Sequence, residues 1–534
     1  MSKKVKNIII EQLTNFEVEN IYGYAGDTIL PFFSAIDKSN INLYTTTHEG
    51  TAGLMASAEG KLRDHLAVCT SHSGPGTANM INGIGDAFKD RVPLLLISGQ
   101  VPSNKIGTDY KQFLTQQELL RPLTVYSAQL TTTDTVIELL YKAVVNAISK
   151  GGVSQLIVPI DLWEKKTSTS LREYPFHLNQ KIHPDNHFIE KAAKKLNESQ
   201  KPVILYGRGV RDYRNELLQL AEKTTSALIA TLPARGMIEF DHPLNIGGLG
   251  KAGNNQAKNA LKDADLVIIL GATWWPANYV PQSTTIIQYD ATAENIGKNH
   301  PVEVSILGDL QFSIQATLDK INYIEKYEWK SYLDELRKEW FMELETETHQ
   351  EGYPLPPQAV VRLLSEQAEP EEIFTLDSGD NVIWFAKYFG NRCQDIIISG
   401  SWRTMGFGLP AALSAMINKN NKVTCIVGDG GLNMFPGELL TAARYNLPLR
   451  IVVFNNGELG MERHKMESAG MSPVEVTLNN PDYIKLAEAC GIDGVRVENL
   501  PHLESILYES KNINKALLID VPVASPTPPG TKLY

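Results

Sequence analysis

The chain has 534 residues, of which 43% are hydrophobic and 21% charged, and its formal net charge is −11. The length predicts about three domains of roughly 150 residues each, with the composition of an ordinary globular protein. The acidic balance argues against a nucleic-acid surface, which needs clustered Lys and Arg. No window approaches the roughly 20 apolar residues of a membrane span, and the first residues lack a signal-peptide pattern. We therefore expect a cytoplasmic protein that binds neither nucleic acid nor a membrane.

The cysteines are scattered along the chain without CxxC or His-rich spacing: Cys69, Cys393, Cys425 and Cys490. Two of them lie in apolar runs that have the character of strands. We expect buried free thiols rather than disulfides or a zinc site.

Residues 1–165 form the first expected domain. Short apolar runs such as "LAVCTSHSGPG" and "PLLLISGQ" lead into glycine turns and helical patterns. Unbroken apolar strands that alternate with helices predict a parallel sheet covered on both faces. Ligands of such sheets bind at the carboxyl ends of the strands, where these glycine turns lie.

Residues 185–330 form the second expected domain. An aperiodic polar stretch from Lys165 to Pro184 precedes it and is typical of a linker. The runs "PVILYGRG" and "LVIILGAT" repeat the unit of strand and glycine turn. A charged helical segment then leads into "EGYPLPP", which marks a second boundary.

Residues 355–534 form the third expected domain, which resembles the first. In each, a strand ends in a glycine turn, a helix follows, and the next strand begins after a proline. The spacing from Gly74 to Pro93 is nearly that from Gly428 to Pro448. This similarity indicates a duplicated domain. The expected fold class is therefore α/β, with three doubly wound parallel-sheet domains of which the first and third are related.

One pair of motifs in the third domain predicts a metal–diphosphate site. Asp429 lies in the turn "GDGG", which opens a helix whose free N–H groups favour an anion. A carboxylate beside a phosphate needs a cation between them, and Mg²⁺ accepts carboxylate, amide and phosphate oxygens. One helix and one strand later, Asn456 returns beside Asp429, and the backbone carbonyl of Glu458 can complete the metal's protein ligands. The alternative is a plain helix cap followed by an Asn turn.

These motifs resemble those of thiamine diphosphate-dependent enzymes, a family that includes pyruvate oxidases, acetolactate synthases and related 2-oxo acid decarboxylases. Three other blocks resemble the family in the family's order: "THEGTAGLMASAEGKL", "SHSGPGTANMINGIGDAFKDRVPLLLISGQV" and "SWRTMGFGLPAALSA". The resemblance covers nearly the whole chain. It implies that the first domain binds the pyrimidine ring of thiamine diphosphate and the third binds its diphosphate with Mg²⁺.

The resemblance also implies roles for individual residues. Glu49 matches the glutamate that hydrogen-bonds the aminopyrimidine and controls the thiazolium proton, and Gln112 is also expected to be catalytic. Met405 matches the residue that holds the cofactor bent. Without the resemblance, Glu49 is a helix-dipole partner and Met405 a core residue. His48 and His72 are candidates for proton transfer or are packed imidazoles. Further expected cofactor contacts are Gly26, Gly74, Pro75, Gly76, Asn79, Gly428, Asp429, Gly430, Gly431, Asn456, Glu458 and Met461, of which Asp429, Asn456 and Glu458 also bind the metal.

The second domain resembles the central domain of pyruvate oxidases. The runs "TWWP" and "IIQYDATAENIGK" favour the form of this domain that binds FAD over the form that serves as bare scaffold. The candidates for FAD contact are Gly207, Gly209, Asp290 and Asp309. Taken singly, each is typical of a turn glycine or a helix-capping Asp.

The sequence departs from the family pattern near the expected substrate site. Lys111 replaces an aromatic residue in "GTDYKQFL", and residues 462–465 ("ERHK") stand where apolar side chains are common. These cations suggest a substrate with a second anionic group, unless their side chains point to solvent. Ala25 stands where proline is usual, with no consequence that we can derive.

The resemblance implies an oligomer and an oxidative reaction. Glu49 and Asp429 lie in different domains, and in the family the cofactor spans two subunits, so we expect a homodimer or homotetramer. We expect decarboxylation of a 2-oxo acid such as pyruvate, with FAD-linked oxidation of the hydroxyalkyl intermediate. A non-oxidative carboligase and a non-catalytic oligomer that kept the fold are the alternatives. The sequence stops soon after the third domain, so we do not expect the membrane-binding tail of quinone-linked pyruvate oxidases.

Overall fold

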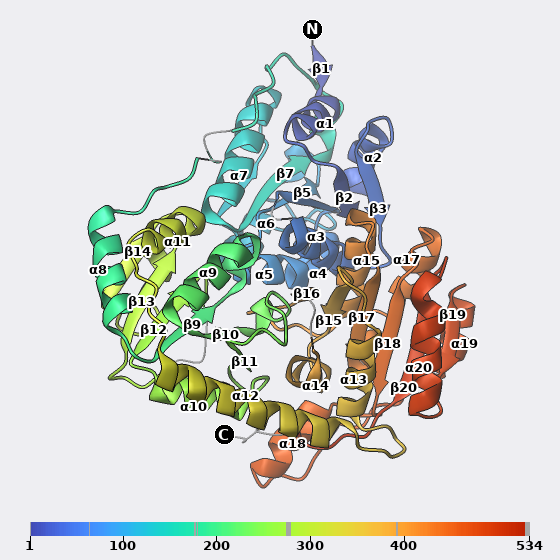
Figure 1. Cartoon of the computed structure of the whole chain (residues 1–534). Coiled ribbons are helices and arrows are strands. Elements are labelled where there is room, and N and C mark those ends of the chain that lie inside the picture. The colour runs from blue at the N-terminus through green and yellow to red at the C-terminus, as the bar shows by residue number, and fades with distance from the viewer. Residues whose placement is uncertain are drawn as a thin grey trace.

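The chain forms three six-stranded sheets with helices on their faces (Figure 1). The structure is a computed structural model and describes residues 2–63, 65–175, 178, 180–273, 279–390 and 394–528. Three residues of the "TWWP" run, Trp274 to Pro276, and Cys393 lie outside the described residues. In Figure 1 the first domain lies at the top, the central domain at the lower left and the third domain at the lower right.

The first domain contains one parallel sheet with the strand order β3-β2-β4-β5-β7-β6. Strands β4, β5 and β7 are buried along their whole length, as expected for apolar runs covered on both faces. The strands are β2 (Asn20–Gly23), β3 (Asn42–Thr45), β4 (Ala67–Ser71), β5 (Leu94–Gln100), β6 (Tyr126–Gln129) and β7 (Val153–Pro159). The helices are α1 (Val5–Asn15), α2 (Leu30–Ile36), α3 (Glu49–Arg63), α4 (Pro75–Asn79), α5 (Ile81–Lys89), α6 (Gln116–Leu120) and α7 (Val136–Lys150). Strand β1 (Lys3–Lys4) pairs antiparallel with β8 (Lys166–Thr167).

The central domain contains a parallel sheet with the order β11-β10-β9-β12-β13-β14. Counted within the domain this is 3-2-1-4-5-6, the order of dinucleotide-binding sheets, with its switch point between β9 and β12. The strands are β9 (Pro202–Tyr206), β10 (Ala227–Ala230), β11 (Asn245–Gly248), β12 (Leu266–Leu270), β13 (Thr285–Asp290) and β14 (Val304–Leu307). The helices are α8 (Asn186–Glu198), α9 (Arg214–Thr224), α10 (Asn255–Asp263), α11 (Leu310–Leu318) and α12 (Tyr327–Thr348). Helix α12 runs along the bottom of Figure 1 toward the third domain.

The third domain contains a parallel sheet with the order β16-β15-β17-β18-β20-β19. The strands are β15 (Ile373–Leu376), β16 (Asp395–Ile398), β17 (Val423–Gly428), β18 (Arg450–Asn455), β19 (Asp493–Arg496) and β20 (Leu517–Pro522). The helices are α13 (Pro357–Gln367), α14 (Asp380–Tyr388), α15 (Gly408–Asn418), α16 (Asp429–Leu432), α17 (Glu438–Arg444), α18 (Gly460–Ser468), α19 (Tyr483–Ala489) and α20 (Leu500–Glu509).

The first and third domains have the same topology. Counted within each domain, both sheets have the order 2-1-3-4-6-5. This agreement confirms the expected α/β fold of three doubly wound parallel sheets, with the outer two domains related to each other.

The outer domains also share one hydrophobic core. A single buried cluster contains Ala52, Leu54 and Ala56 of α3 together with Leu409 and Ala412 of α15. The small side chains of α3 allow this close packing of helices from two domains. Helix α3 of the first domain therefore packs against α15 of the third domain, the helix that follows Met405 in the sequence.

Two further observations concern the cysteines and membrane insertion. Within the described residues, Cys69 and Cys425 are buried free thiols and Cys490 is a half-buried free thiol. Burial raises the pKa of the thiols of Cys69 and Cys425. Among the helices that the structure describes, none combines the length and the apolar character needed to cross a bilayer.

Candidate active site

A cavity of about 930 Å³ opens at the carboxyl ends of β15, β17 and β18. This is the edge where doubly wound sheets bind their ligands. The central domain closes one side of the cavity with residues 249–252 and Tyr279. All eight third-domain residues expected to hold the cofactor line it: Met405, Gly428, Asp429, Gly430, Gly431, Asn456, Glu458 and Met461.

The register of two neighbouring strands brings the expected metal ligands together. Strands β17 and β18 are parallel, with Gly428 opposite Phe454, so Asp429 and Asn456 both emerge from the same edge. One carboxylate oxygen of Asp429 accepts a hydrogen bond from the backbone N–H of Gly457 at 2.7 Å. The helix and return strand between the motifs thus place Asp429 against the Asn456–Gly457 turn.

Asp429 is a buried carboxylate whose hydrogen-bond donors are neutral. Only 2% of the residue is exposed, and the side-chain amide of Asn480 donates to it at 2.7 Å. Burial raises the pKa of Asp429 above its usual range, although hydrogen bonds from Asn480 and backbone N–H groups oppose the shift. A cation bound beside Asp429 would therefore strongly favour the ionised form of this carboxylate.

The backbone of Glu458 is oriented toward the same turn. Glu458 lies opposite Thr477 in an antiparallel bridge, and the flanking hydrogen bonds run from Leu459 N–H to Val476 and from Leu478 N–H to Gly457. In such a bridge the enclosed residue directs its own N–H and C=O away from its partner. The N–H of Glu458 accordingly donates to Asn456 Oδ1 at 3.2 Å, and its carbonyl lies on the same side. The carboxylate, amide and carbonyl oxygens fit a hard divalent cation such as Mg²⁺.

At one position of the "GDGG" turn, packing within the protein leaves no room for a side chain. A Cβ on Gly431 would lie 2.8 Å from Cγ of Asp377, a buried carboxylate at the end of β15. The same carboxylate accepts hydrogen bonds from the backbone N–H groups of Gly406 at 3.0 Å and Gly408 at 2.9 Å. Asp377 therefore connects the diphosphate turn to the segment that carries Met405.

The first domain holds the Met405 segment, residues 399–405, from the other side. The backbone N–H groups of Gly400 and Ser401 donate to Asp90, and the hydroxyl of Ser399 donates to Asp86 at 2.6 Å. Both carboxylates bind the ammonium of Lys61, at 2.6 Å for Asp86 and 2.7 Å for Asp90. This buried network fixes Met405 relative to the first domain.

The first-domain residues form a second cluster. The amide of Asn79 donates to Glu49 Oε2 at 3.0 Å, and a Cβ on Gly76 would lie 3.3 Å from Glu49 Oε1. Gly74 has φ +60°, and a Cβ there would lie 2.5 Å from the carbonyl oxygen of Gln112. Gly26 packs on the ring of His72. Glu49, Gly26, Gly74, Pro75, Gly76, Asn79 and Gln112 thus lie around one set of strand ends.

Both histidines of this cluster have hydrogen-bonded roles. The N–H of Thr28 donates to Nδ1 of His72, which leaves Nε2 as the donor to Gln112 Oε1 at 3.1 Å. Nδ1 of His48 accepts from the N–H of Gly50 at 3.0 Å. His72 therefore links the backbone of Thr28 to the side chain of Gln112.

Among the described residues of one chain, this cluster does not line the third-domain cavity. Its members are absent from the cavity wall, which the third and central domains form. One chain therefore presents the two halves of the predicted cofactor site separately.

A second cavity, of about 370 Å³, lies at the switch point of the central sheet. All four residues expected to contact FAD line it: Gly207, Gly209, Asp290 and Asp309. Arg208, Arg211 and Arg235 also line it, as does Lys61 of the first domain. Lys61 and Arg211 already pair with two carboxylates of the same lining, Asp90 and Asp395. The position of the cavity at the switch point is the feature that suits a dinucleotide.

Comparison with known proteins identifies the family to which the three domains belong. Residues 3–119 match the N-terminal TPP (thiamine pyrophosphate, or diphosphate) binding domain of thiamine pyrophosphate enzymes, residues 189–320 their central domain and residues 377–521 their C-terminal TPP binding domain. The acetolactate synthase of Mycobacterium leprae is 30% identical, covering 96% of this chain and 86% of its own. The chain belongs to the thiamine pyrophosphate enzyme family.

Two other relatives show the range of this family. A Bacillus subtilis protein, YdaP, is 32% identical over the whole of this chain and 94% of its own, and its name provisionally describes it as containing thiamine pyrophosphate. The pyruvate oxidase of Lactiplantibacillus plantarum is 27% identical over 98% of this chain and 89% of its own. These names cover both oxidase and synthase activities.

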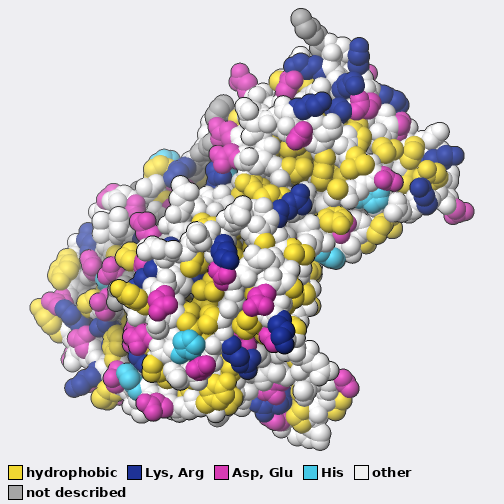
Figure 2. Space-filling view, turned by 90° about the vertical axis from the view of Figure 1, so that its right-hand side faces the viewer, with side chains coloured by type: hydrophobic (Ala, Val, Ile, Leu, Met, Phe, Trp, Pro, Cys, Tyr) yellow, Lys and Arg dark blue, Asp and Glu magenta, His cyan; other side chains and the backbone are white. Residues whose placement is uncertain are grey.

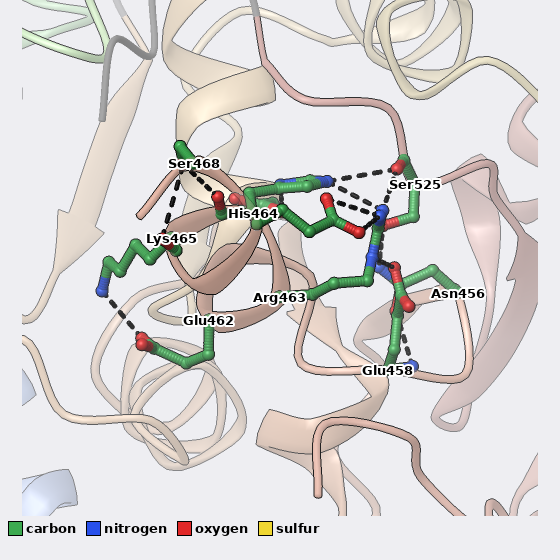
Figure 3. Close-up of polar contacts among 10 residues, drawn as sticks. Asn456, Glu458, Glu462, Arg463, His464, Lys465, Ser468 and Ser525 are labelled. Carbon is green, nitrogen blue, oxygen red and sulfur yellow. Dashed lines mark hydrogen bonds and ion pairs between the residues drawn. The ribbon is translucent and has the colours of Figure 1, made fainter. Parts of the chain in front are cut away.

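In this thiamine pyrophosphate enzyme, the charged residues 462–465 divide into two pairs (Figure 3). Glu462 and Lys465 line the cavity and form an ion pair with each other at 2.8 Å. Arg463 and His464 turn toward the end of the chain, where both contact Ser525. Lys111 is exposed on the first domain. Glu462 thus offsets the charge of Lys465 within one chain, and a substrate with a second anionic group stays a prediction.

Sequence reasoning missed three residues of the site. Asn480 donates to Asp429, and the Asn pair that stands before a proline in "TLNNPDY" was a signal that could have indicated it. Asp380 lines the cavity at the start of α14 and lies 3.4 Å from the ring of buried His464. The Asp380 carboxylate raises the pKa of His464, which can therefore offset the negative charge of Asp380. Arg403 lines both cavities.

Proposed function

We propose that this enzyme uses Mg²⁺ and thiamine diphosphate to decarboxylate a 2-oxo acid such as pyruvate, with FAD-linked oxidation of the product. The observation that carries the proposal is the meeting of a buried carboxylate, an amide oxygen and a backbone carbonyl at one turn of the larger cavity: Asp429, Asn456 and Glu458. The cofactor, when bound, supplies a nucleophilic carbon and an electron sink.

The chain's own residues bind that cofactor and control its protons. Asp429, Asn456 and the carbonyl of Glu458 would hold Mg²⁺, and the N–H groups at the start of α16 would favour the diphosphate. Met405 supports the cofactor between its two ends. Glu49 hydrogen-bonds the pyrimidine ring, oriented by the amide of Asn79.

The separation of the two half-sites supports a dimer. Glu49 and its neighbours do not line the cavity of their own chain, so a second copy is needed to bring them to Asp429. Hydrophobic side chains gather over the upper half of the face in Figure 2. Leu30, Met434 and Leu440 are each about half exposed, and Met434 precedes Phe435, whose ring contacts His48. A homodimer or a homotetramer built from such dimers would cover apolar surface of this kind.

The arrangement of the two cavities favours the oxidase. Both are lined by Thr231, Pro233, Ile398 and Arg403, so they adjoin along the contact between the central and third domains. A dinucleotide with its phosphates at the switch point of the central sheet could extend from there to the thiamine site. This continuity supports FAD as a second cofactor, contacted at Gly207, Gly209, Asp290 and Asp309.

The second candidate is a non-oxidative carboligase. The similarity to acetolactate synthases over nearly the whole chain favours it. Addition of a 2-oxo acid to the anaerobic holoenzyme separates the two activities. The oxidase reading predicts that the yellow flavin absorbance bleaches, whereas flavin that stays oxidised during turnover would exclude it.

Cofactor content and substrate class can be tested directly. Mass spectrometry of the small molecules released from the gently purified protein should identify thiamine diphosphate and FAD. A panel of 2-oxo acids scored for carbon dioxide release should then identify the substrate class. Absence of carbon dioxide release with every acid in the cofactor-loaded protein would contradict the proposed function.

A further inference from the structure

Arg463 connects the metal-binding turn to the C-terminal segment (Figure 3). Its Nε donates to the carboxylate of Glu458 at 2.7 Å. One terminal nitrogen donates to the carbonyl of Ser525 at 2.6 Å and reaches the hydroxyl of the same serine at 3.3 Å. A planar guanidinium holds its donors at fixed angles to one another, whereas a lysine ammonium is a compact charge on a flexible stem.

Ser525 in turn contacts the expected metal ligand. The amide nitrogen of Asn456 donates to the hydroxyl oxygen of Ser525 at 3.3 Å. Arg463 also donates to that oxygen, so the hydroxyl of Ser525 accepts from both side chains. Because the N–H of Glu458 donates to the oxygen of Asn456, the two contacts together hold the amide with its NH₂ group facing Ser525 and its oxygen facing the turn.

The orientation of Asn456 matters because only its oxygen can bind a cation. The oxygen accepts one hydrogen bond, from the N–H of Glu458, and keeps a second lone pair for a metal. A flipped amide would direct two N–H donors at the cation. The contacts from Glu458 and Ser525 together therefore favour the ligating form.

The C-terminal segment is itself anchored at this point. The N–H of Val523 donates to the carbonyl of Asn455 at 3.0 Å, and that of Ala524 donates to Leu355 at 2.9 Å. Buried His464 adds a second contact to the carbonyl of Ser525, at 3.2 Å. Ser525 is thus held beside the turn by the backbone of its own segment and by the side chains of Arg463 and His464.

We propose that Ser525 and Arg463 are positioning residues that set the Mg²⁺ affinity by orienting Asn456. This inference rests on the proposed function, in which Asn456 is a metal ligand. Partners that orient metal ligands typically change metal affinity by about 10–100-fold when they are removed.

The test is calorimetric titration of MgCl₂ into metal-free protein in a buffer that contains thiamine diphosphate at one fixed concentration for all variants. We expect Ser525→Ala to weaken Mg²⁺ binding at least about 10-fold, with Ser525→Thr close to wild type because it keeps the hydroxyl. Arg463→Lys should weaken binding in the same direction. Ser468→Ala is the matched control, because among the residues that the structure describes the hydroxyl of Ser468 bonds to backbone carbonyls within α18.

The melting temperature of the metal-free protein separates positioning from stability. We expect metal-free Ser525→Ala to have the melting temperature of the metal-free wild-type protein, although its Mg²⁺ affinity is lower. Wild-type Mg²⁺ affinity in Ser525→Ala would overturn the inference, as would equal weakening in Ser525→Thr. Absence of Mg²⁺ binding by the wild-type protein would instead contradict the proposed function, so the two failures are distinguishable.

Discussion

At the scale of single residues, Asp377 is a carboxylate that the fold keeps buried beside the cofactor cavity. It is 1% exposed, and burial raises its pKa to about 7 in spite of hydrogen bonds from backbone N–H groups. The folded protein therefore binds this proton more tightly than the unfolded chain does. The stability that Asp377 contributes is complete below its ordinary value of 3.8 and is lost as the pH rises through about 7.

We expect Asp377→Asn to remove this pH dependence, because an amide does not ionise. Relative to wild type, the unfolding free energy of the variant should rise with pH by about 1.4 kcal/mol per unit within that window. Denaturant unfolding of the metal-free proteins at pH 5, 6 and 8 measures the difference. If the difference in unfolding free energy between Asp377→Asn and wild type stayed constant across this pH range, the raised pKa of Asp377 would be contradicted.

Glu49→Gln keeps the size of the side chain but removes the carboxylate that faces Asn79. We expect carbon dioxide release to fall by about 10²–10⁴-fold, the usual contribution of an acid–base group. Thiamine diphosphate binding should persist, as judged by calorimetry. Glu138→Gln, at a surface ion pair of α7, is the control and should keep wild-type activity. Retained activity in Glu49→Gln would exclude the proposed role.

Residues of the site were predictable where strand register or a family motif specifies them. Asp429 and Asn456 lie at the ends of two adjacent strands, and one helix and one strand separate them in sequence. Ser525 could not be predicted in this way, because its contact with Asn456 depends on how β20 and the following segment lie against β18. Arg463 was predicted to face substrate or solvent, but it binds Glu458 and Ser525.

At the scale of elements, α3 and α5 hold the segment that carries Met405. Lys61 is 4% exposed at its side chain and bridges Asp86 and Asp90, which bind residues 399–401. Removing one member of a buried ionic group leaves uncompensated charge in the interior. We expect Lys61→Met to lower the unfolding free energy by about 3–5 kcal/mol.

Guanidinium chloride unfolding measures this effect. Lys142→Met removes an exposed ion pair on α7 and should change stability by less than about 1 kcal/mol. Equal effects of the two substitutions would show that the Lys61 network does not connect the domains.

The order of the strands was less accessible from the sequence than their existence. The similar spacing of turn and proline in the outer domains indicated their relationship, and both sheets have the order 2-1-3-4-6-5. The contact between α3 and α15 was not predicted, because apolar periodicity identifies a buried helix face without identifying its partner.

At the scale of the whole molecule, the half-sites of one chain are separate, and we propose that a second copy completes each site. Glu49→Gln and Asp429→Asn should each be inactive as pure proteins. A mixed dimer would hold one site with both substitutions and one intact site. After random reassembly we expect about a quarter of wild-type activity, because half of the dimers are mixed. No recovery, with mixed dimers demonstrated by mass spectrometry, would place the site within one chain.

The central claim is that a divalent cation held by Asp429 and Asn456 anchors thiamine diphosphate. Calorimetric titration of thiamine diphosphate into cofactor-free protein tests it most directly, with MgCl₂ or EDTA in the buffer. We predict saturable binding with Mg²⁺, no binding with EDTA, and at least about 10-fold weaker binding with Mg²⁺ in Asp429→Asn. Absence of binding to the wild-type protein with Mg²⁺, or equal binding with EDTA, would contradict the account.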